Sequence, residues 1–500
     1  MDEVEKVIRE EVTSLYISII LLFFPLVYGD GLFNITQIKY TVYMRTTLVY
    51  FILIFFMSIT YYIRNKFDKV EIFLFALIAV WCVGLYFSFD RYECFIGNQH
   101  KKTGMFFYLI AILTAIIIRK NLKWKTSMTW CLIASTGIVS LLQILNRWGI
   151  DPLGYWSEIS RPQNKWYIST LGNINYNAAF VCLTISIVIC MFILCREKRK
   201  KIIFGIVIIS SFAGGICCSS DGFYIGMLAV FLIVFAYACI MPKLWKEVWS
   251  LCLCWWIANV MISILYNFLP GKNTGIWGVS EKILDIRVIA LETVLLIAFY
   301  LVVRFGNEFL EKNALWIKRI YAGIISLMCL VTAVLFIVAT WQSFPENHPL
   351  HWFVFNEKWG TNRGGLWIKA VNLFKESDIV HKLFGYGHNM VALSLEKVLR
   401  DNNLGRTVIA DVHNTYLNML ITSGIIGLIL FMIAMIYLLK NGIRLIKENK
   451  ESGLFVVAGT GTYLAQALIN GPQSITSPIV LLGFGIFLGI IYNNSDKEIE

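Results

Sequence analysis

Long apolar runs recur along the whole sequence and constrain its fold more than any other feature. Most of them reach about 18 to 25 residues, enough for a helix to cross about 30 Å of hydrocarbon. Inside a membrane, open strands would leave backbone polar groups unsatisfied, so the runs are predicted to be helices. The candidate spans cover residues 12–28, 46–63, 71–88, 104–119, 128–146, 174–195, 202–218, 222–240, 248–268, 287–303, 320–341, 415–439, 453–470 and 477–492. The predicted fold class is therefore all-α, a polytopic transmembrane bundle of about 14 spans.

The composition agrees with a membrane bundle. Hydrophobic residues make up 58% of the chain and charged residues 15%, whereas soluble domains contain about a quarter charged residues. The net charge of +12 does not indicate nucleic acid, because the basic residues punctuate the apolar runs and form no single patch. Residues 1–11 are charged and the first apolar run is long enough to be retained as a span, so no cleavable signal is expected. The twelve cysteines lie mostly within apolar runs, and neither a disulfide framework nor a thiolate metal site is expected.

The distribution of Lys and Arg predicts the orientation. Densely basic connections alternate along the chain at residues 64–69, 119–125, 196–201, 243–246, 304–319 and 440–450. With the two termini they hold 25 Lys and Arg, against 11 on the opposite side once residues 342–414 are set aside. Short cytoplasmic connections are enriched in these residues, so both termini are predicted to be cytoplasmic.

One long connection divides the chain into three predicted parts. Residues 1–341 form an N-terminal bundle of 11 spans, residues 342–414 an extracytoplasmic catalytic loop, and residues 415–500 a C-terminal group of three spans. Loops of this length are usually functional. Apolar residues recur at helical spacing in residues 363–377 and 390–400, which predicts two short helices on the membrane surface over the bundle. Two helices that merely cover the bundle would give the same pattern.

All the histidines fall on the outer side in this topology: His100, His348, His351, His381, His388 and His413. A histidine in a loop is most often a solvated polar residue, but histidine is also the usual general base near neutral pH. His413 differs by position, because it lies where the long loop re-enters the membrane and faces both water and lipid headgroups. His348 and His351 could pair on a metal, but no carboxylate ligand pattern accompanies them, so no metal site is predicted.

Isolated cations mark the outer loops: Arg91, Lys101, Lys102, Arg147, Arg161, Lys165, Arg287 and Arg363. Arginine can grip a lipid diphosphate with two parallel hydrogen bonds and lysine acts as a point charge, although each cation alone would also serve as a headgroup anchor. The spans contain few acidic residues, which argues against an ion-coupled transporter. Glu292 is the clear exception. It is a functional candidate, unless it only pairs with a neighbouring cation such as Arg287.

Four segments carry patterns of glycine, asparagine, arginine and histidine, in the order 92–104, 169–179, 362–387 and 413–427. Together they resemble signatures of the O-antigen ligase and polysaccharide polymerase superfamily. Residues 92–104, with Gly97 ahead of the two lysines, are similar to its Gly-x-x-x-Arg-x-x-Gly loop. Residues 169–179 (STLGNINYNAA) resemble its Gly-x-x-Gly-Asn-Pro-Asn-Tyr-x-Ala signature, with Ile174 in place of the usual proline. Residues 362–387 (NRGGLWIKA, then GYG) look like its Gly-Arg-x-x-x-Trp-x-x-Ala…Gly-x-Gly pattern. Residues 413–427 (HNTYL…SGIIG) look like its His-Asn-x-x-Leu…Gly-x-x-Gly signature.

The resemblance covers roughly residues 85–435 and includes two departures from the family pattern. The family often has Ser-Arg where this chain has Ser220 and Asp221, which removes an expected phosphate-binding arginine. Lys165, Arg161 or Arg287 would then have to substitute for it. In addition, His388 follows Gly387 where proline or glycine is common.

The resemblance implies an inverting, metal-independent membrane glycosyltransferase without a cofactor. Its donor would be a glycan on undecaprenyl diphosphate, and its acceptor a hydroxyl of another glycan. Fixed cations can stabilise the leaving diphosphate without a metal. The implied catalytic residues are His413, which meets the acceptor hydroxyl, and Arg363, which holds the donor. The implied substrate-binding residues are Asn173, Asn175, Lys165, Arg161, Arg287, Lys102, Trp367, Gly385, Gly387, His388, Asn414 and Tyr416.

The resemblance also implies a place in the bacterial cytoplasmic membrane. The expected partners are lipid-linked glycan repeat units, membrane lipids, a flippase and a chain-length regulator, and not nucleic acid. A surface-polysaccharide polymerase is the favoured function. The nearest alternative is an O-antigen-type ligase on the same fold, which attaches finished glycan to a carrier. A transporter of lipid-linked oligosaccharide or solute is a different class. It would line a cleft with charges along several spans and would not need a long outer loop with one reactive histidine.

Overall fold

The computed structural model describes residues 2–29, 34–64, 67–98, 101–154, 156, 161–269, 275–399 and 412–495. It is 81% helical, and its described strands, β1 (Tyr167–Ile168) and β2 (Gly172–Asn173), form one small antiparallel pair. The all-α prediction is confirmed.

Each predicted span coincides with a long helix. These helices are α1 (Asp2–Leu26), α2 (Ile35–Arg64), α3 (Lys69–Tyr86), α5 (Met105–Asn121), α6 (Thr126–Arg147), α7 (Ile174–Leu194), α8 (Lys198–Cys217), α9 (Asp221–Ile240), α10 (Trp245–Phe268), α12 (Ile286–Phe305), α14 (Ala314–Gln342), α18 (Thr415–Lys447), α19 (Ser452–Ala467) and α20 (Ser477–Ser495). Within the described part of the chain, 11 helices are long and apolar enough to cross a membrane. The three others are α5 and α19, with 17 and 16 residues, and α1, which begins with charged residues. The protein is a multi-pass membrane protein.

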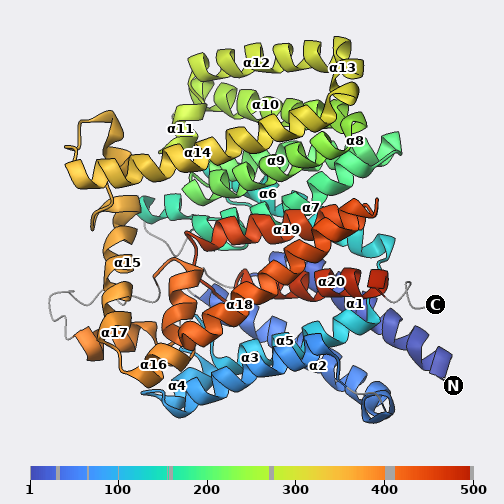
Figure 1. Cartoon of the computed structure of the whole chain (residues 1–500), viewed down its shortest axis with the longest axis vertical. Helices are drawn as coiled ribbons and strands as arrows, with labels where there is room; N and C mark the ends of the chain where they lie inside the picture. Colours follow the sequence, from blue (N-terminus) through green and yellow to red (C-terminus); the bar gives the residue numbers. More distant parts are fainter. Residues whose placement is uncertain are drawn as a thin grey trace.

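The short elements lie between the long helices. They are α4 (Arg91–Ile96), η3 (Arg161–Trp166), η4 (Pro242–Leu244), α11 (Val279–Ile283), α13 (Asn307–Lys312), η6 (Pro349–Phe353), α15 (Trp359–Glu376), α16 (Ile379–Phe384) and α17 (Val391–Leu399). Helices α15 and α17 confirm the two helices predicted in the long loop. They gather with α16 at one end of the bundle, and α15 runs across the long helices, whereas both chain termini lie at the opposite end (Figure 1). We call these the outer end and the inner end.

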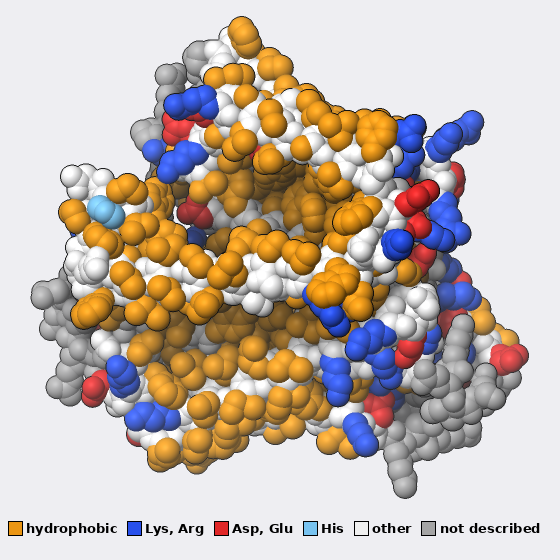
Figure 2. Space-filling model, turned by 45° about the horizontal axis from the view of Figure 1, so that its top comes forward, with side chains coloured by type: hydrophobic (Ala, Val, Ile, Leu, Met, Phe, Trp, Pro, Cys, Tyr) orange, Lys and Arg blue, Asp and Glu red, His pale blue; other side chains and the backbone are white. Residues whose placement is uncertain are grey.

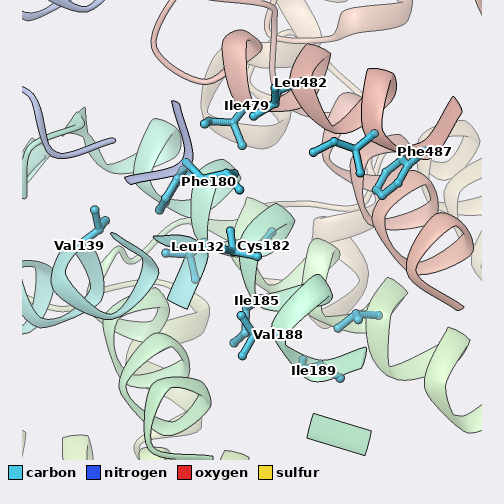
Figure 3. Packing of buried hydrophobic residues seen from close by; sticks show 14 of the residues in the cluster. Leu132, Val139, Phe180, Cys182, Ile185, Val188, Ile189, Ile479, Leu482 and Phe487 are labelled. Carbon is cyan, nitrogen blue, oxygen red and sulfur yellow. The ribbon is translucent and has the colours of Figure 1, made fainter. Parts of the chain in front are cut away.

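Helix α7 forms the centre of the bundle. It is apolar on all sides, as expected of a helix enclosed by others, and it packs against α6, α8, α9, α10 and α19. Phe180, Ile185 and Val188 are almost fully buried along it, and Leu132 and Val139 of α6 lie nearby (Figure 3). This packing holds the segment ahead of α7, residues 169–173, firmly at the outer end.

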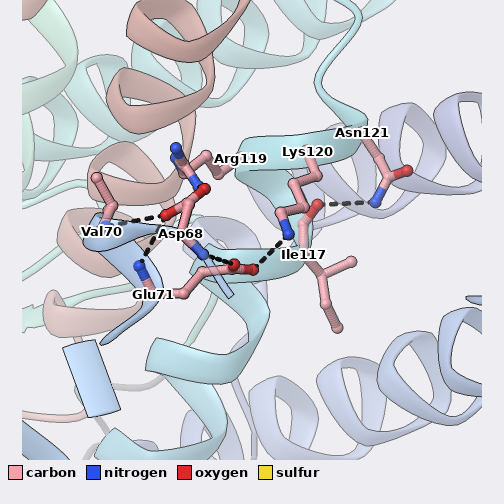
Figure 4. A network of polar contacts seen from close by, with 7 residues as sticks. All are labelled: Asp68, Val70, Glu71, Ile117, Arg119, Lys120 and Asn121. Atoms are coloured by element: carbon pink, nitrogen blue, oxygen red, sulfur yellow. Dashed lines mark hydrogen bonds and ion pairs between the residues drawn. The ribbon is translucent and has the colours of Figure 1, made fainter. Parts of the chain in front are cut away.

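Ion pairs join the helices at the inner end. The Asp68 side chain caps α3 by accepting from the backbone N–H groups of Val70 and Glu71, and it pairs with Arg119 at 2.5 Å (Figure 4). Glu71 pairs with Lys120 at 2.6 Å. Lys123 and Lys125 of the same basic connection pair with Glu10 and Glu11 in the N-terminal half of α1. Residues 119–125 therefore lie at the same end as the N-terminus.

Helices α12 and α14 have few neighbours. Helix α12 packs on α10, α14 packs on α9, and only 6% of the residues in the most apolar stretch of each are buried. Figure 2 shows their hydrophobic faces with a hollow between them. Glu292 of α12 accepts hydrogen bonds from Asn259 Nδ2 (2.9 and 3.1 Å) and Trp255 Nε1 (3.3 Å), both on α10. The suggested pairing of Glu292 with Arg287 is therefore wrong, because Arg287 pairs with Asp285 at 2.6 Å.

The arrangement predicts the result of a topology experiment. Reporter fusions at both termini and within residues 196–201 should report a cytoplasmic location, because basic connections are retained on the cytoplasmic side. Fusions within residues 343–399 should report a location outside the cytoplasm. A cytoplasmic signal from the long loop would place the candidate active site on the wrong side of the membrane.

Candidate active site

The His-Asn segment forms the junction between the long loop and α18. Asn414 is the N-cap of α18, and its Nδ2 donates to the backbone oxygen of Leu468 at 3.0 Å. The Tyr416 hydroxyl donates to the backbone oxygen of Leu464 at 2.8 Å. Both residues were expected to bind substrate, and in the structure both fasten α18 to α19. They thereby fix the position of His413.

His413 occupies a left-handed backbone conformation, with φ +48°. This region is uncommon for residues other than glycine, although histidine is among the more tolerant types. The indole Nε1 of Trp367 in α15 donates to the backbone oxygen of Val412 at 3.0 Å, and the Trp367 ring packs against Trp359 with centroids 5.3 Å apart. Trp367 therefore holds the backbone immediately before His413.

Two cations from different parts of the chain lie close enough to His413 to act on it electrostatically. Its side chain is open to solvent at one side, yet the surrounding protein removes enough water to lower its pKa. The charges of Lys101 and Arg363 lower this pKa further, to about 4. The imidazole is therefore neutral at physiological pH and has a nitrogen lone pair to offer.

Lys101 comes from the loop between α4 and α5. Lys102 is the lysine expected at the site, but Lys101 is the buried one, with 8% of its surface exposed, and burial lowers its pKa to about 7. Gly97 (φ +91°) and Gly104 hold this loop closed, because a Cβ on either would overlap the backbone of the other. The glycines flanking the two lysines were a signal of this tight loop, but they do not say which lysine points inward.

Arg363 follows an unusual turn at the start of α15. Gly360, Thr361 and Asn362 all have left-handed φ, at 59°, 63° and 70°, a conformation that costs L-residues about 1–2 kcal/mol each. Gly364 then passes so close to the backbone oxygen of Asn356 that a Cβ would overlap it. The strained turn and the close approach direct Arg363 toward the bundle.

The α8–α9 hairpin faces Arg363 from the membrane side. Its tight turn is confirmed, since α8 ends at Cys217 and α9 begins at Asp221. The Ser220 hydroxyl donates to Asn175 Oδ1 at 2.7 Å, which joins the hairpin to the start of α7. Burial lowers the pKa of Arg363, and the nearby carboxylate of Asp221 opposes this change. Asp221 thus partly neutralises the arginine that the resemblance assigns to the donor.

The asparagines of residues 169–179 have structural partners. Asn173 is the N-cap of α7 and accepts from the Asn175 N–H at 2.8 Å. Asn177, which the sequence analysis does not single out, is fully buried, and its Nδ2 donates to the backbone oxygens of Ile168, Gly172 and Asn173. This motif therefore shapes the turn that leads into α7.

The glycines of the Gly-x-Gly segment pack against a kink in α18. Gly424 has φ +65° and ψ −173°, which interrupts the helix and frees two carbonyl groups. The N–H groups of Tyr386 and Gly387 donate to the backbone oxygens of Ile421 and Thr422 at 2.9 and 3.0 Å. A Cβ on Gly385 or Gly387 would overlap neighbouring atoms. Packing accounts for both glycines, which were expected to contact substrate.

This packing predicts a large effect of Gly387→Ala on stability. The positive φ should cost about 1–2 kcal/mol, and overlap with Cys94 a further 1–3 kcal/mol or so. Gly154→Ala is the matched control, because Gly154 also has a positive φ (+70°) but nothing within 4 Å. Thermal unfolding in detergent should therefore shift more for Gly387→Ala. Equal shifts would mean that the close approach contributes nothing.

The remaining candidates lie apart from this cluster. Lys165 is exposed, with Nζ 5.2 Å from the ring centroid of Trp166. Arg287 is also exposed and pairs with Asp285. The side chain of Arg161 and all of His100 lie outside the described residues. His388 is buried behind the cluster, between α3 and α5.

Other outer residues have structural partners. Arg147 is fully buried and donates to the backbone oxygens of Cys217 and Gly275 at 2.7 and 2.8 Å. His348 caps η6 by accepting from the Leu350 N–H, and the Nδ1 of His351 lies 2.8 Å from the backbone oxygen of Phe344. Among the described residues there is no group of three or more potential ligands that could hold a metal ion.

Comparison with known families matches residues 284–432 to the O-antigen ligase family. The matched segment begins directly after α11, ends near the middle of α18 and contains Arg363, His388 and His413. Comparison with curated proteins finds no match. The match includes two of the four predicted motifs, at residues 362–387 and 413–427, and it agrees with the multi-pass helical bundle. Residues 284–432 of this multi-pass membrane protein are therefore similar to the O-antigen ligase family.

Proposed function

We propose that the protein joins a glycan carried on undecaprenyl diphosphate to an acceptor hydroxyl, as a surface-polysaccharide polymerase. The observation that carries this proposal is the meeting of Lys101, Arg363 and His413 at the outer end of a membrane bundle. Two cations suit a diphosphate, and a neutral imidazole beside them suits a hydroxyl. A transporter would not need these three groups at one point.

The proposed reaction breaks the bond between the anomeric carbon of the donor and its diphosphate oxygen. Lys101 and Arg363 stabilise the negative charge that develops on the leaving diphosphate, so the residues present supply the role that a metal would otherwise take. His413 accepts the proton of the acceptor hydroxyl as this oxygen attacks from the opposite face, which inverts the anomeric centre. The bound diphosphate also offsets the positive charges around His413 and raises its pKa, which makes it a better base.

Purified protein with lipid-linked repeat units tests the proposal. Longer lipid-linked glycan and free undecaprenyl diphosphate should form in equal amounts, and EDTA should not reduce the rate. Transfer only to a separate carrier, with no elongation, would identify a ligase. Strong inhibition by EDTA would contradict the metal-independent mechanism, and no transfer to either acceptor would contradict the enzyme.

A further inference from the structure

An apolar cavity of about 150 Å³ lies among α3, α5, α7, α18, α19 and α20, on the side of the bundle where α3, α5, α18 and α20 lie together (Figure 1). Its walls are mostly aliphatic and aromatic, with Leu74, Leu77 and Met435 among them. Polar residues join the lining where the helices reach the outer end, such as Asn418 in the first turn of α18 and Ser477 at the start of α20. The cavity is therefore amphipathic along its length.

His388 forms part of this polar lining. Only 6% of its surface is exposed, and its ring lies between Trp81 and Tyr108, with centroids 4.8 and 4.7 Å away. Its Nε2 is buried and has no hydrogen-bond partner among the described residues. A buried polar atom without a hydrogen-bond partner destabilises the fold, so such an atom calls for a ligand or a water.

The cavity continues toward the active site. A small second cavity shares Tyr108, His388, Asn418 and Pro472 with the first, and Lys101 is in its lining. Lys101 is one of the two cations beside His413. An apolar space inside the bundle is thus connected through His388 to the charged groups at the outer end.

We propose that this cavity receives the apolar chain of a lipid phosphate, with the phosphate at Lys101 and the His388 Nε2 donating to a phosphate oxygen. This inference rests on the proposed function and assigns the lipid to the donor. In the donor the anomeric carbon is bonded directly to the diphosphate, whereas in a lipid-linked acceptor a whole repeat unit separates the lipid from the reacting hydroxyl. A lipid phosphate beside His413 therefore belongs to the donor.

Filling the cavity tests the proposal. Met419→Trp and Ala179→Phe place aromatic rings in its wall, at positions that are only half-buried. The matched control is Met191→Trp, which fills a neighbouring apolar cavity of about 300 Å³ that shares only Leu183 and Ile479 with the first. The probe is a polyprenyl phosphate with a photoreactive group on its chain. Crosslinking should fall about tenfold in the first two variants and remain unchanged in the control.

His388→Leu tests the polar contact at the same site. Leucine is apolar and similar in size to histidine, so the variant should fold and should still bind the apolar chain of the lipid. The preference for polyprenyl phosphate over the neutral polyprenol of equal length should fall about tenfold, as expected for the loss of one hydrogen bond to a charged group. An unchanged preference would mean that only a buried water satisfies His388.

The experiments distinguish a failure of the lipid-site proposal from a failure of the proposed function. If folded Met419→Trp binds and uses the long-chain donor as well as the wild type, the cavity is not the lipid site, even though transfer is real. If the wild type crosslinks the probe in the cavity but transfers no glycan, the proposed function is wrong and the lipid site stands. Donors with a chain of one or two isoprene units should be used equally well by the wild type and by the two cavity-filling variants.

Discussion

Replacing His413 by alanine should reduce glycan transfer by about 10²–10⁴-fold, the usual effect of removing a general base. The residue lies ahead of α18 and its side chain is open to solvent, so folding and membrane insertion should be retained. Single repeat units on undecaprenyl diphosphate should accumulate on the outer leaflet, and long glycan should disappear. His348→Ala is the matched control, since His348 lies in the same loop and caps η6, and it should retain activity.

His413→Gln separates two roles for the imidazole. An amide can hydrogen-bond to the acceptor hydroxyl but cannot accept its proton at neutral pH, so a loss close to that of alanine supports a base. A mild effect would support an orienting role. Accumulation of lipid-linked units on the cytoplasmic leaflet would contradict the enzyme and support a flippase.

The pH dependence follows from the same residue. The pKa of His413 lies at about 4, below its ordinary value of 6.5. As pH is lowered, kcat/KM should therefore stay unchanged through pH 6.5 and fall only as pH approaches about 4. The unfolded chain binds more protons between these two pKa values. This group therefore lowers the free energy of unfolding as pH falls through that window. An acid limb at pH 6.5 would show that His413 does not have the electrostatic surroundings described above.

Arg363→Ala should remove about 2–4 kcal/mol of transition-state stabilisation, because a positioned charge on the leaving diphosphate is lost. Arg363→Lys should lose less, since lysine keeps the charge but not the paired hydrogen bonds. Steady-state kinetics with a lipid-diphosphate donor measures both. Arg287→Ala is the control, because Arg287 is exposed and pairs with Asp285. If both Arg363 variants transfer glycan at the wild-type rate, Arg363 does not act on the donor and serves only as an anchor for lipid headgroups.

The helices and their order could be predicted because each depends on local sequence. A run of about 20 apolar residues must form a helix in lipid, since its backbone polar groups have no other partners. The hairpin at Ser220 and the helical patterns of α15 and α17 were equally local. His413 could be chosen as a candidate site residue because it lies at a predicted membrane boundary. The four motifs and their order could be recognised because they resemble signatures of a known family.

Only the tertiary structure distinguished residues that the motifs treat alike. Whether Lys101 or Lys102 enters the site depends on the loop that Gly97 and Gly104 close, and a one-residue change reverses the direction of a side chain. The roles of Gly385 and Gly387 depend on the kink at Gly424 of α18, which lies nearly 40 residues later in the chain.

An all-α membrane bundle with one long loop follows from the sequence alone, because burial of apolar runs in lipid is a property of each segment. The tertiary structure decided which polar groups meet, because Lys101, Arg363 and His413 come from three separate segments whose positions depend on packing. Packing also decides the position of His388. This residue of the long loop is buried against Trp81 and Tyr108, where it lines a cavity inside the bundle. Contacts between distant segments are set by how the helices pack and leave no pattern in the local sequence.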